Sequence, residues 1–176
     1  ALVAIGRAPD LAIGALPSMV RRLAVRPIFR ASSRHPFVAD IVVASGYVGV
    51  LLLGHTPAIY DESVSHPLLH GAEHLVFASV GLVFWWHVGS LRRGARADVA
   101  RAVALVLVVM FPGTLLGAYL AFANVPVYAP SAGGERLLDQ TAAGLVMLMP
   151  MGMLFAADAL ASVHRLVVPK ALGRLR

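Results

Sequence analysis

The stretch that decides the fold is residues 66–89, HPLLHGAEHLVFASVGLVFWWHVG. From Pro67 onward its length and apolar character are those of a helix that crosses a bilayer, which takes about 20 predominantly apolar residues. Its first nine residues nevertheless include three histidines and one glutamate. Ionisable side chains at the edge of hydrocarbon are costly and usually serve a function. The stretch therefore predicts a transmembrane helix with a polar cluster at one end.

The polar residues of this stretch lie on one side of the predicted helix. At about 100° per residue, His66, His70 and Glu73 fall within about 60° of one another. His74 lies about 40° beyond His70 and, at about 1.5 Å rise per residue, about 12 Å deeper than His66. We call His66, His70, Glu73 and His74 the histidine cluster, and we expect it to run from the membrane surface inward.

The composition places the whole chain among integral membrane proteins. Of its 176 residues, 59% are hydrophobic and 14% are charged, and the mean hydropathy is +0.78. A soluble domain usually carries about 25% charged residues. Cysteine is absent, which leaves histidine and methionine as ligands for a soft metal. In a membrane protein the net charge of +6 indicates cytoplasmic loops rather than a nucleic-acid partner.

Four apolar segments predict an all-α, polytopic transmembrane helical bundle with four spans. The segments are residues 36–54, 67–89, 99–123 and 139–163. Asp40 lies inside the first span, so we expect it to face protein rather than lipid, and Asp158 in the fourth can pair with an arginine. Pro112 and Pro150 predict kinks in the third and fourth spans. Residues 58–65, AIYDESVS, read as a loop between the first two spans.

The chain divides into three parts around this bundle. Residues 1–35 combine an apolar segment, read as a partial or interfacial helix, with a basic connector. Residues 36–165 form the four-helix transmembrane domain, and residues 166–176 form a basic tail. The bundle is thus the part in which a site is expected.

The basic residues predict the orientation of the bundle. Thirteen of the fifteen lysines and arginines lie before the first span, between the second and third spans, or after the fourth. The positive-inside rule places these regions in the cytoplasm. The histidine cluster then lies on the outer, non-cytoplasmic side of the membrane.

Residues outside the histidine cluster can complete a metal site. His55 ends the first span where the second begins, so it can lie close to the cluster. Met147 and Met151 are four residues apart in MLMPMGM and share a helix face, and Asp139 opens the same span. Imidazole and thioether groups suit copper, and a carboxylate can orient a ligating histidine. The simpler interpretations are headgroup contacts for the histidines, a helix cap for Asp139 and apolar filling for the methionines.

Two further interpretations of the histidines remain open. His70, Glu73 and His74 form an HxxEH sequence like that of inverted zinc proteases, although no third ligand or substrate channel is evident. His87 and His164 end the second and fourth spans, and a facing pair of histidines can ligate a haem. Both signals are weaker than the concentration of histidines at the other end of the bundle.

Residues 54–75 and 139–150 together resemble the CtaG family of cytochrome c oxidase assembly factors, in the form associated with caa3-type oxidases. The family shows a His-x-Pro…Tyr run that ends one span, followed by His-Pro-Leu-Leu-His-x-x-Glu-His at the start of the next. It also shows Asp-Gln, a spacer, Ala-Gly, then Met and Pro, matched from Asp139 to Pro150. The resemblance covers roughly residues 9 to 165. Leu148 stands where the family often has Trp, and we expect the family's upstream helices, with a His-x-x-x-His motif, to be missing here.

The resemblance implies a multi-pass protein of the bacterial inner (plasma) membrane that takes part in maturing the oxidase copper centre. Its partners would be an oxidase subunit and the lipid bilayer. We expect the metal ligands to be His55, His66, His70, His74, Met147 and Met151, with Glu73 and Asp139 orienting them. Such a protein transfers copper and turns nothing over, so we do not expect an enzyme. The alternative is an accessory transmembrane subunit of a respiratory or photosynthetic complex that binds no metal, which the missing upstream helices favour.

Overall fold

The structure is a computed structural model that describes residues 18, 35–128 and 136–167. All regular secondary structure in these ranges is helical. The predictions for residues 1–17, 19–34 and 168–176, which include the N-terminal helix and most of the basic connector and tail, lie outside the described residues.

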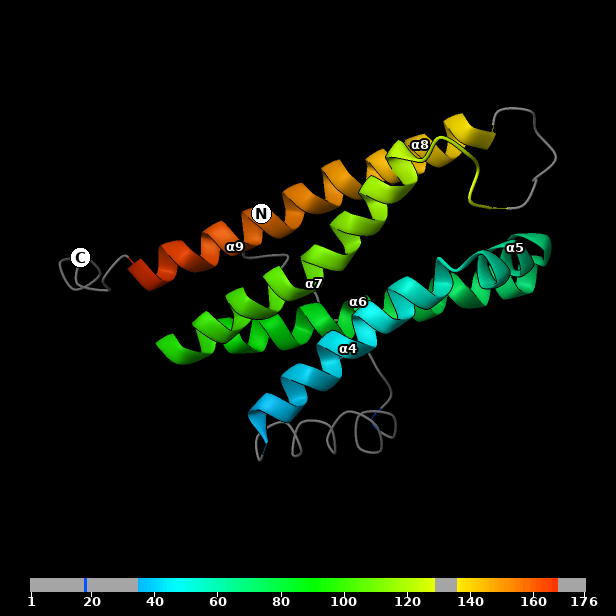
Figure 1. The fold of residues 1–176 in the computed structure, drawn as a ribbon. Coiled ribbons are helices and arrows are strands. Elements are labelled where there is room, and N and C mark those ends of the chain that lie inside the picture. The colour runs from blue at the N-terminus through cyan, green and yellow to red at the C-terminus, as the bar shows by residue number, and fades with distance from the viewer. Residues whose placement is uncertain (1–17, 19–34, 129–135, 168–176) are drawn as a thin grey trace.

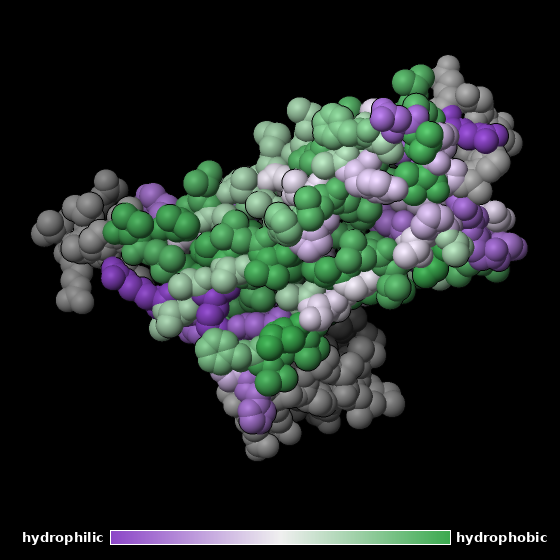
Figure 2. All heavy atoms as spheres, in the orientation of Figure 1, coloured by the Kyte–Doolittle hydropathy of each residue, from purple (hydrophilic) through white to green (hydrophobic). Residues whose placement is uncertain are grey.

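Four long helical runs correspond to the four predicted spans. They are α4 (Pro36–Gly54), α6 (Pro67–Arg92), α7 (Arg96–Phe122) and the continuous series α8 (Arg136–Val146), η2 (Met147–Met151) and α9 (Gly152–Val167). Each run is long and apolar enough to cross a membrane. Figure 2 shows hydrophobic side chains over the middle of the bundle and hydrophilic side chains gathered toward its ends. The predicted fold class is therefore confirmed for the described residues.

The predicted loop between the first two spans is wrong, because these residues form helix α5 (Pro57–Ser65). Pro57 occupies a first-turn position, where its fixed φ suits a helix start, and Thr56 before it is extended. The backbone N–H of Tyr60 donates to the carbonyl of Thr56 at 2.9 Å, which closes the first turn. α5 packs along the start of α6 (Figure 1). Helix α5 thereby brings Ser63, which is 1% exposed, into contact with His70 of the histidine cluster.

α7 is the central helix of the bundle. It contacts α4 and α6 on one side and the α8–η2–α9 series on the other (Figure 1). Because the chain runs up and down, the end of α4, the starts of α6 and α8, and the whole of α5 lie at one end, which we call the histidine end. The opposite end, with the end of α6 and the start of α7, is called the arginine end.

The hydrophobic core lies in the half of the bundle nearer the arginine end. Its centre is Phe84 on α6, which is fully buried against Tyr47 of α4 and Phe155 of α9. Val106 and Val109 of α7 are 0% and 1% exposed and complete it. The helices are thus fixed by side-chain packing in this half, whereas the histidine end contains a larger cavity.

Helices α7 and α8 pack with their backbones in close contact, without large side chains between them at Gly144. A Cβ atom on Gly144 would lie 2.4 Å from the backbone nitrogen of Ala121 and 2.7 Å from the carbonyl oxygen of Gly117. Only glycine permits this contact. Further along, the chain passes Pro150 through the π-helical turn η2, whereas α7 remains helical through Pro112. π-turns within longer helices occur frequently at functional sites.

Candidate metal-binding site

His70 and His74 form a pair on adjacent turns of α6. Their Nε2 atoms are 3.1 Å apart and their rings meet edge to face with centroids 4.4 Å apart. Both residues are exposed. Two nitrogens that bind one tetrahedral ion at about 2.0–2.1 Å lie about 3.3 Å from each other. The two imidazoles therefore already lie at nearly the separation that a shared metal ion requires.

A hydroxyl and a carboxylate fix the orientation of His70. The Oγ atom of Ser63 lies 3.3 Å from Nδ1 of His70, and its proton is donated to Oε2 of Glu73. Because that proton is used, the Ser63 oxygen accepts from Nδ1–H of His70. The Nε2 atom of His70 consequently keeps its lone pair, which accepts from Nε2–H of His74 at 3.1 Å. A histidine that ligates a metal uses the same lone pair and donates its other N–H.

The second oxygen of Glu73 is buried without a hydrogen-bond partner among the described residues. It faces the end of α4, where a Cβ atom on Gly54 would lie 3.1 Å from it and 2.5 Å from the ring of Phe77. Glycine at position 54 therefore lets α4 approach the carboxylate. A buried, unpaired carboxylate oxygen needs a cation, a proton or a water molecule to satisfy it.

His55 lies in a separate part of the histidine end. Its Nδ1 atom is 2.8 Å from the carbonyl oxygen of Leu51, which can only accept, so Nδ1 carries the proton and Nε2 is free to bind. His55 lines a cavity of about 290 Å³ together with Asp139 and Met147. The other lining residues are Tyr60, Leu120, Pro126, Tyr128, Arg136, Gln140, Ala143 and Val146.

Two tyrosines form one wall of this cavity. The rings of Tyr60 and Tyr128 are stacked with centroids 4.0 Å apart, and the Tyr128 hydroxyl donates to the backbone oxygen of His55 at 3.2 Å. Burial and the nearby Tyr60, Asp61 and Tyr119 raise the pKa of Tyr128 to about 12. The phenol therefore stays protonated and keeps donating to His55 well above neutral pH.

Gln140 holds the segment that carries Tyr128. Its Oε1 atom accepts from the backbone N–H of Val127 at 2.6 Å, and its Nε2 atom donates to the carbonyl of Leu120 at 3.2 Å. Gln140 is 7% exposed, so both groups are removed from solvent and matched. The side chain of Gln140 on α8 thus links the segment that carries Tyr128 to α7.

The comparisons with known proteins bear on this arrangement. The model of the cytochrome c oxidase caa3 assembly factor family (Caa3_CtaG) matches residues 1–167. The chain belongs to this family. The resemblance identified from the sequence motifs is therefore confirmed, and with it a place in oxidase assembly. No curated protein and no solved structure matched the chain.

The structure divides the predicted ligands into two groups. His70 and His74, backed by Glu73, form one, whereas His55, Met147 and Asp139 line the cavity and form the other. Across the residues that the structure describes, no three His, Asp or Glu side chains are arranged to hold one metal ion. The copper site stays a prediction, and its ligands do not meet at a single point here.

Two of the predicted ligands belong to neither group. His66 is exposed, and its Nδ1 atom lies 3.2 Å from the carboxylate of Glu62 and 3.2 Å from the backbone oxygen of the same residue. The side chain of Met151 lies outside the described part of the chain.

Sequence analysis gave no role to Ser63, Tyr60, Tyr128 and Gln140, although Tyr60 and Gln140 belong to the family motifs. The first two were hidden by reading α5 as a loop. Ser63 and His70 are seven residues apart, which is about two helical turns, but they belong to two helices and meet across the bend between them. Gln140 belongs to the Asp-Gln motif that the sequence shares with the family, but nothing in the sequence indicates which groups its buried amide bonds.

Several ionisable groups at the arginine end are paired with one another. Asp40 accepts from Nε2 of His87 and from Arg101, in both cases at 2.7 Å, and Arg92 pairs with Asp158. The predictions that Asp40 faces protein and that Asp158 meets an arginine are confirmed. His87, considered above as a haem ligand with His164, has its Nε2 atom occupied by a carboxylate.

Proposed function

We propose that this protein binds copper within the membrane and passes it to a subunit of cytochrome c oxidase while the oxidase copper centre is assembled. Family membership supplies the assembly role. The observation that carries the copper role is the His70–His74 pair, with Nε2 atoms 3.1 Å apart and a hydrogen-bond network that leaves a lone pair on His70.

The chemistry of the pair suits transfer rather than storage. Two imidazoles occupy only part of the coordination shell of copper, so a ligand of the partner can bind before the ion is released. Glu73 places a negative charge behind the pair and balances the charge of the ion. Only coordination bonds form and break, so the reaction needs no catalytic residue.

The orientation of the bundle fits delivery from the outer side of a bacterial inner membrane. Thirteen of the fifteen lysines and arginines belong to the three regions that the positive-inside rule assigns to the cytoplasm. The histidine end then faces outward, where both His70 and His74 are open to an incoming ion or partner.

The test compares the double variant His70→Ala, His74→Ala with His66→Ala. His66 is an exposed histidine of the same stretch that bonds to Glu62 and is the matched control. The measurements are copper bound by the purified full chain under anaerobic Cu(I) loading, and copper content of the oxidase in cells that carry each variant. We expect the double variant to lose about tenfold or more in copper affinity and to lower oxidase copper, while His66→Ala changes neither.

Unchanged copper binding and unchanged oxidase copper in the double variant would end the proposal. A stable, stoichiometric complex with the oxidase that holds no copper at this pair would support the alternative, an accessory transmembrane subunit.

A further inference from the structure

The cavity lined by His55 and Met147 is distinct from the His70–His74 pair, and we infer that it is a second binding site for monovalent copper. The inference rests on the proposed function, since the cargo is the same. Neither His70 nor His74 lines the cavity, and His55 does not join them in a three-ligand group. Two incomplete sites at one end of the bundle would let the ion pass from one to the other before it reaches the partner.

His55 is held in the form that binds a metal. The carbonyl of Leu51 accepts the proton of Nδ1, and the backbone oxygen of His55 itself accepts from Tyr128. Ligating histidines usually donate one ring N–H to a carbonyl or carboxylate and bind metal with the other nitrogen. No hydrogen bond of Nε2 is present among the described residues, so this nitrogen is available at the cavity.

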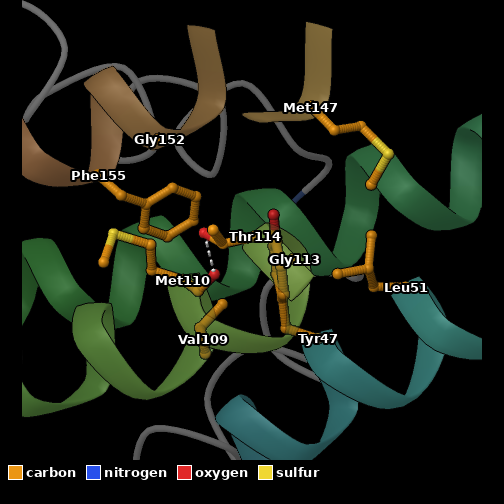
Figure 3. A pocket seen from close by; sticks show the side chains of 9 residues that line it. All are labelled: Tyr47, Leu51, Val109, Met110, Gly113, Thr114, Met147, Gly152 and Phe155. Atoms are coloured by element: carbon orange, nitrogen blue, oxygen red, sulfur yellow. Dashed lines mark hydrogen bonds between the residues drawn. The ribbon is translucent and has the colours of Figure 1, made fainter. Parts of the chain in front are cut away.

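Met147 supplies a soft ligand on the opposite helix. In Figure 3 its side chain is one of those that line a smaller cavity of about 50 Å³, and it ends beside Leu51, whose carbonyl holds His55. Met147 also lines the larger cavity, so this residue borders both. Thioether and imidazole together favour Cu(I) over harder divalent ions.

The neighbouring methionines show that this placement is specific. Met149 and Met153 are 65% and 71% exposed on the apolar outside of the bundle. A methionine that merely fills an apolar interior has no reason to face a cavity lined by His55 and Asp139. Met149 and Met153 therefore provide matched controls for Met147 within the same run of sequence.

The rest of the cavity has room for additional small ligands and includes one charge of each sign. Asp139 contributes a carboxylate, and Arg136 carries the opposite charge on the same wall. At about 30 Å³ per water molecule, a volume of about 290 Å³ holds about ten waters, so an ion bound to His55 and Met147 keeps room for further ligands. The formal charges of Asp139 and Arg136 cancel, so His55 and Met147 would hold the ion as neutral ligands.

Glu73 connects the His70–His74 pair with the end of α4. Its Oε2 atom belongs to the network that orients His70, while its unpaired Oε1 atom faces Gly54, the residue before His55. Glu73 itself does not line the cavity, so its carboxylate belongs to the first site. The ion keeps its oxidation state in such a transfer, and no reductant or oxidant is needed.

The experiment is an anaerobic Cu(I) titration of the purified full chain, with X-ray absorption at the copper edge to detect sulfur ligands. The variants are Met147→Leu, the control Met149→Leu, and the double variant His70→Ala, His74→Ala. Leucine nearly conserves the volume of methionine, so packing is retained. We expect two equivalents of copper and a copper–sulfur signal in the natural chain and in Met149→Leu. Met147→Leu should lose the sulfur signal and bind one equivalent about tenfold or more weakly.

Each outcome separates the inference from the proposed function. One equivalent that the double histidine variant abolishes and that Met147→Leu leaves unchanged would overturn the second site alone. One equivalent that only Met147→Leu weakens would support the cavity and overturn the role of the His70–His74 pair. Loss of both equivalents in the double variant would mean a single shared site and would also overturn the inference. Binding of no copper at all to the natural chain would overturn both the inference and the proposed function.

Discussion

One carboxylate at each end of the bundle is bonded in a different way. At the arginine end, Asp40 has both oxygens occupied, by His87 and by Arg101. At the histidine end, Glu73 has one oxygen occupied by Ser63 and one buried oxygen without a partner among the described residues. A carboxylate whose oxygens are both matched holds helices together, whereas one with a free oxygen is available to a ligand.

Burial separates the histidines but not the two carboxylates, since the side chain of Glu73 is 15% exposed. The side chains of Asp40 and His87 are 12% and 6% exposed, whereas that of His70 is 46% exposed. Buried ion pairs are costly to break but add little net stability over apolar packing. The comparison teaches that the arginine end fixes the positions of α4, α6 and α7, and that the histidine end is free to exchange its contacts.

The largest expected effect comes from breaking the arginine end with Asp40→Ala. The change leaves the cation of Arg101 and the ring of His87 without their acceptor, so we expect the free energy of unfolding to fall by about 3 kcal/mol. Unfolding in mixed detergent micelles measures it, and the copper stoichiometry of the folded protein should not change. Asp98→Ala is the control, because Asp98 meets the same arginine but is 36% exposed, and it should cost about 1 kcal/mol or less. Equal losses in the two variants would remove the distinction between the ends.

A smaller effect is expected where backbones meet beside the cavity. In Gly144→Ala the new methyl group meets the backbone of Ala121 and Gly117, and the helices must separate at a cost of about 1–3 kcal/mol. Gly71→Ala is the matched control at the histidine end, since a Cβ there has nothing within 4 Å. Replacing a helical glycine by alanine in open space should stabilise by up to about 1 kcal/mol. Thermal unfolding of the two variants in one detergent gives the comparison, and a destabilised Gly71→Ala would contradict it.

The sequence predicted the parts of this fold that follow from hydrophobic length. The four spans appear because a membrane helix needs a long apolar segment, which few other structures need. Asp40 and Asp158 were correctly expected to meet protein, because an unpaired charge in lipid costs several kcal/mol, of order 3 on insertion scales. These inferences depend on composition and on one helix at a time.

The candidate site depends on how helices meet, and there the sequence was less informative. Taking residues 58–65 as a loop hid Ser63 and made His55 appear free to join the histidine cluster. Helix α5 instead fills the bend, and His55 takes the side of α4 that borders α8 through the cavity. The helical spacing of His70 and His74 was sufficient to predict their contact, since both lie on one helix.

The smallest expected effect tests the wall of the cavity through Tyr128→Phe. At about pH 7 the variant loses the hydrogen bond to the backbone of His55, which should cost about 1 kcal/mol. The pKa of Tyr128 is about 12 in the folded protein, against 10.0 for an ordinary tyrosine. The unfolded chain therefore releases this proton first, so the stability that Tyr128 contributes is complete below about pH 10 and is lost as the pH rises toward 12. The difference in unfolding free energy between the natural chain and Tyr128→Phe should shrink over that window. Tyr60→Phe keeps the hydrogen bond to His55 and is the control, and a difference that does not vary with pH would show that Tyr128 is not the titrating wall residue.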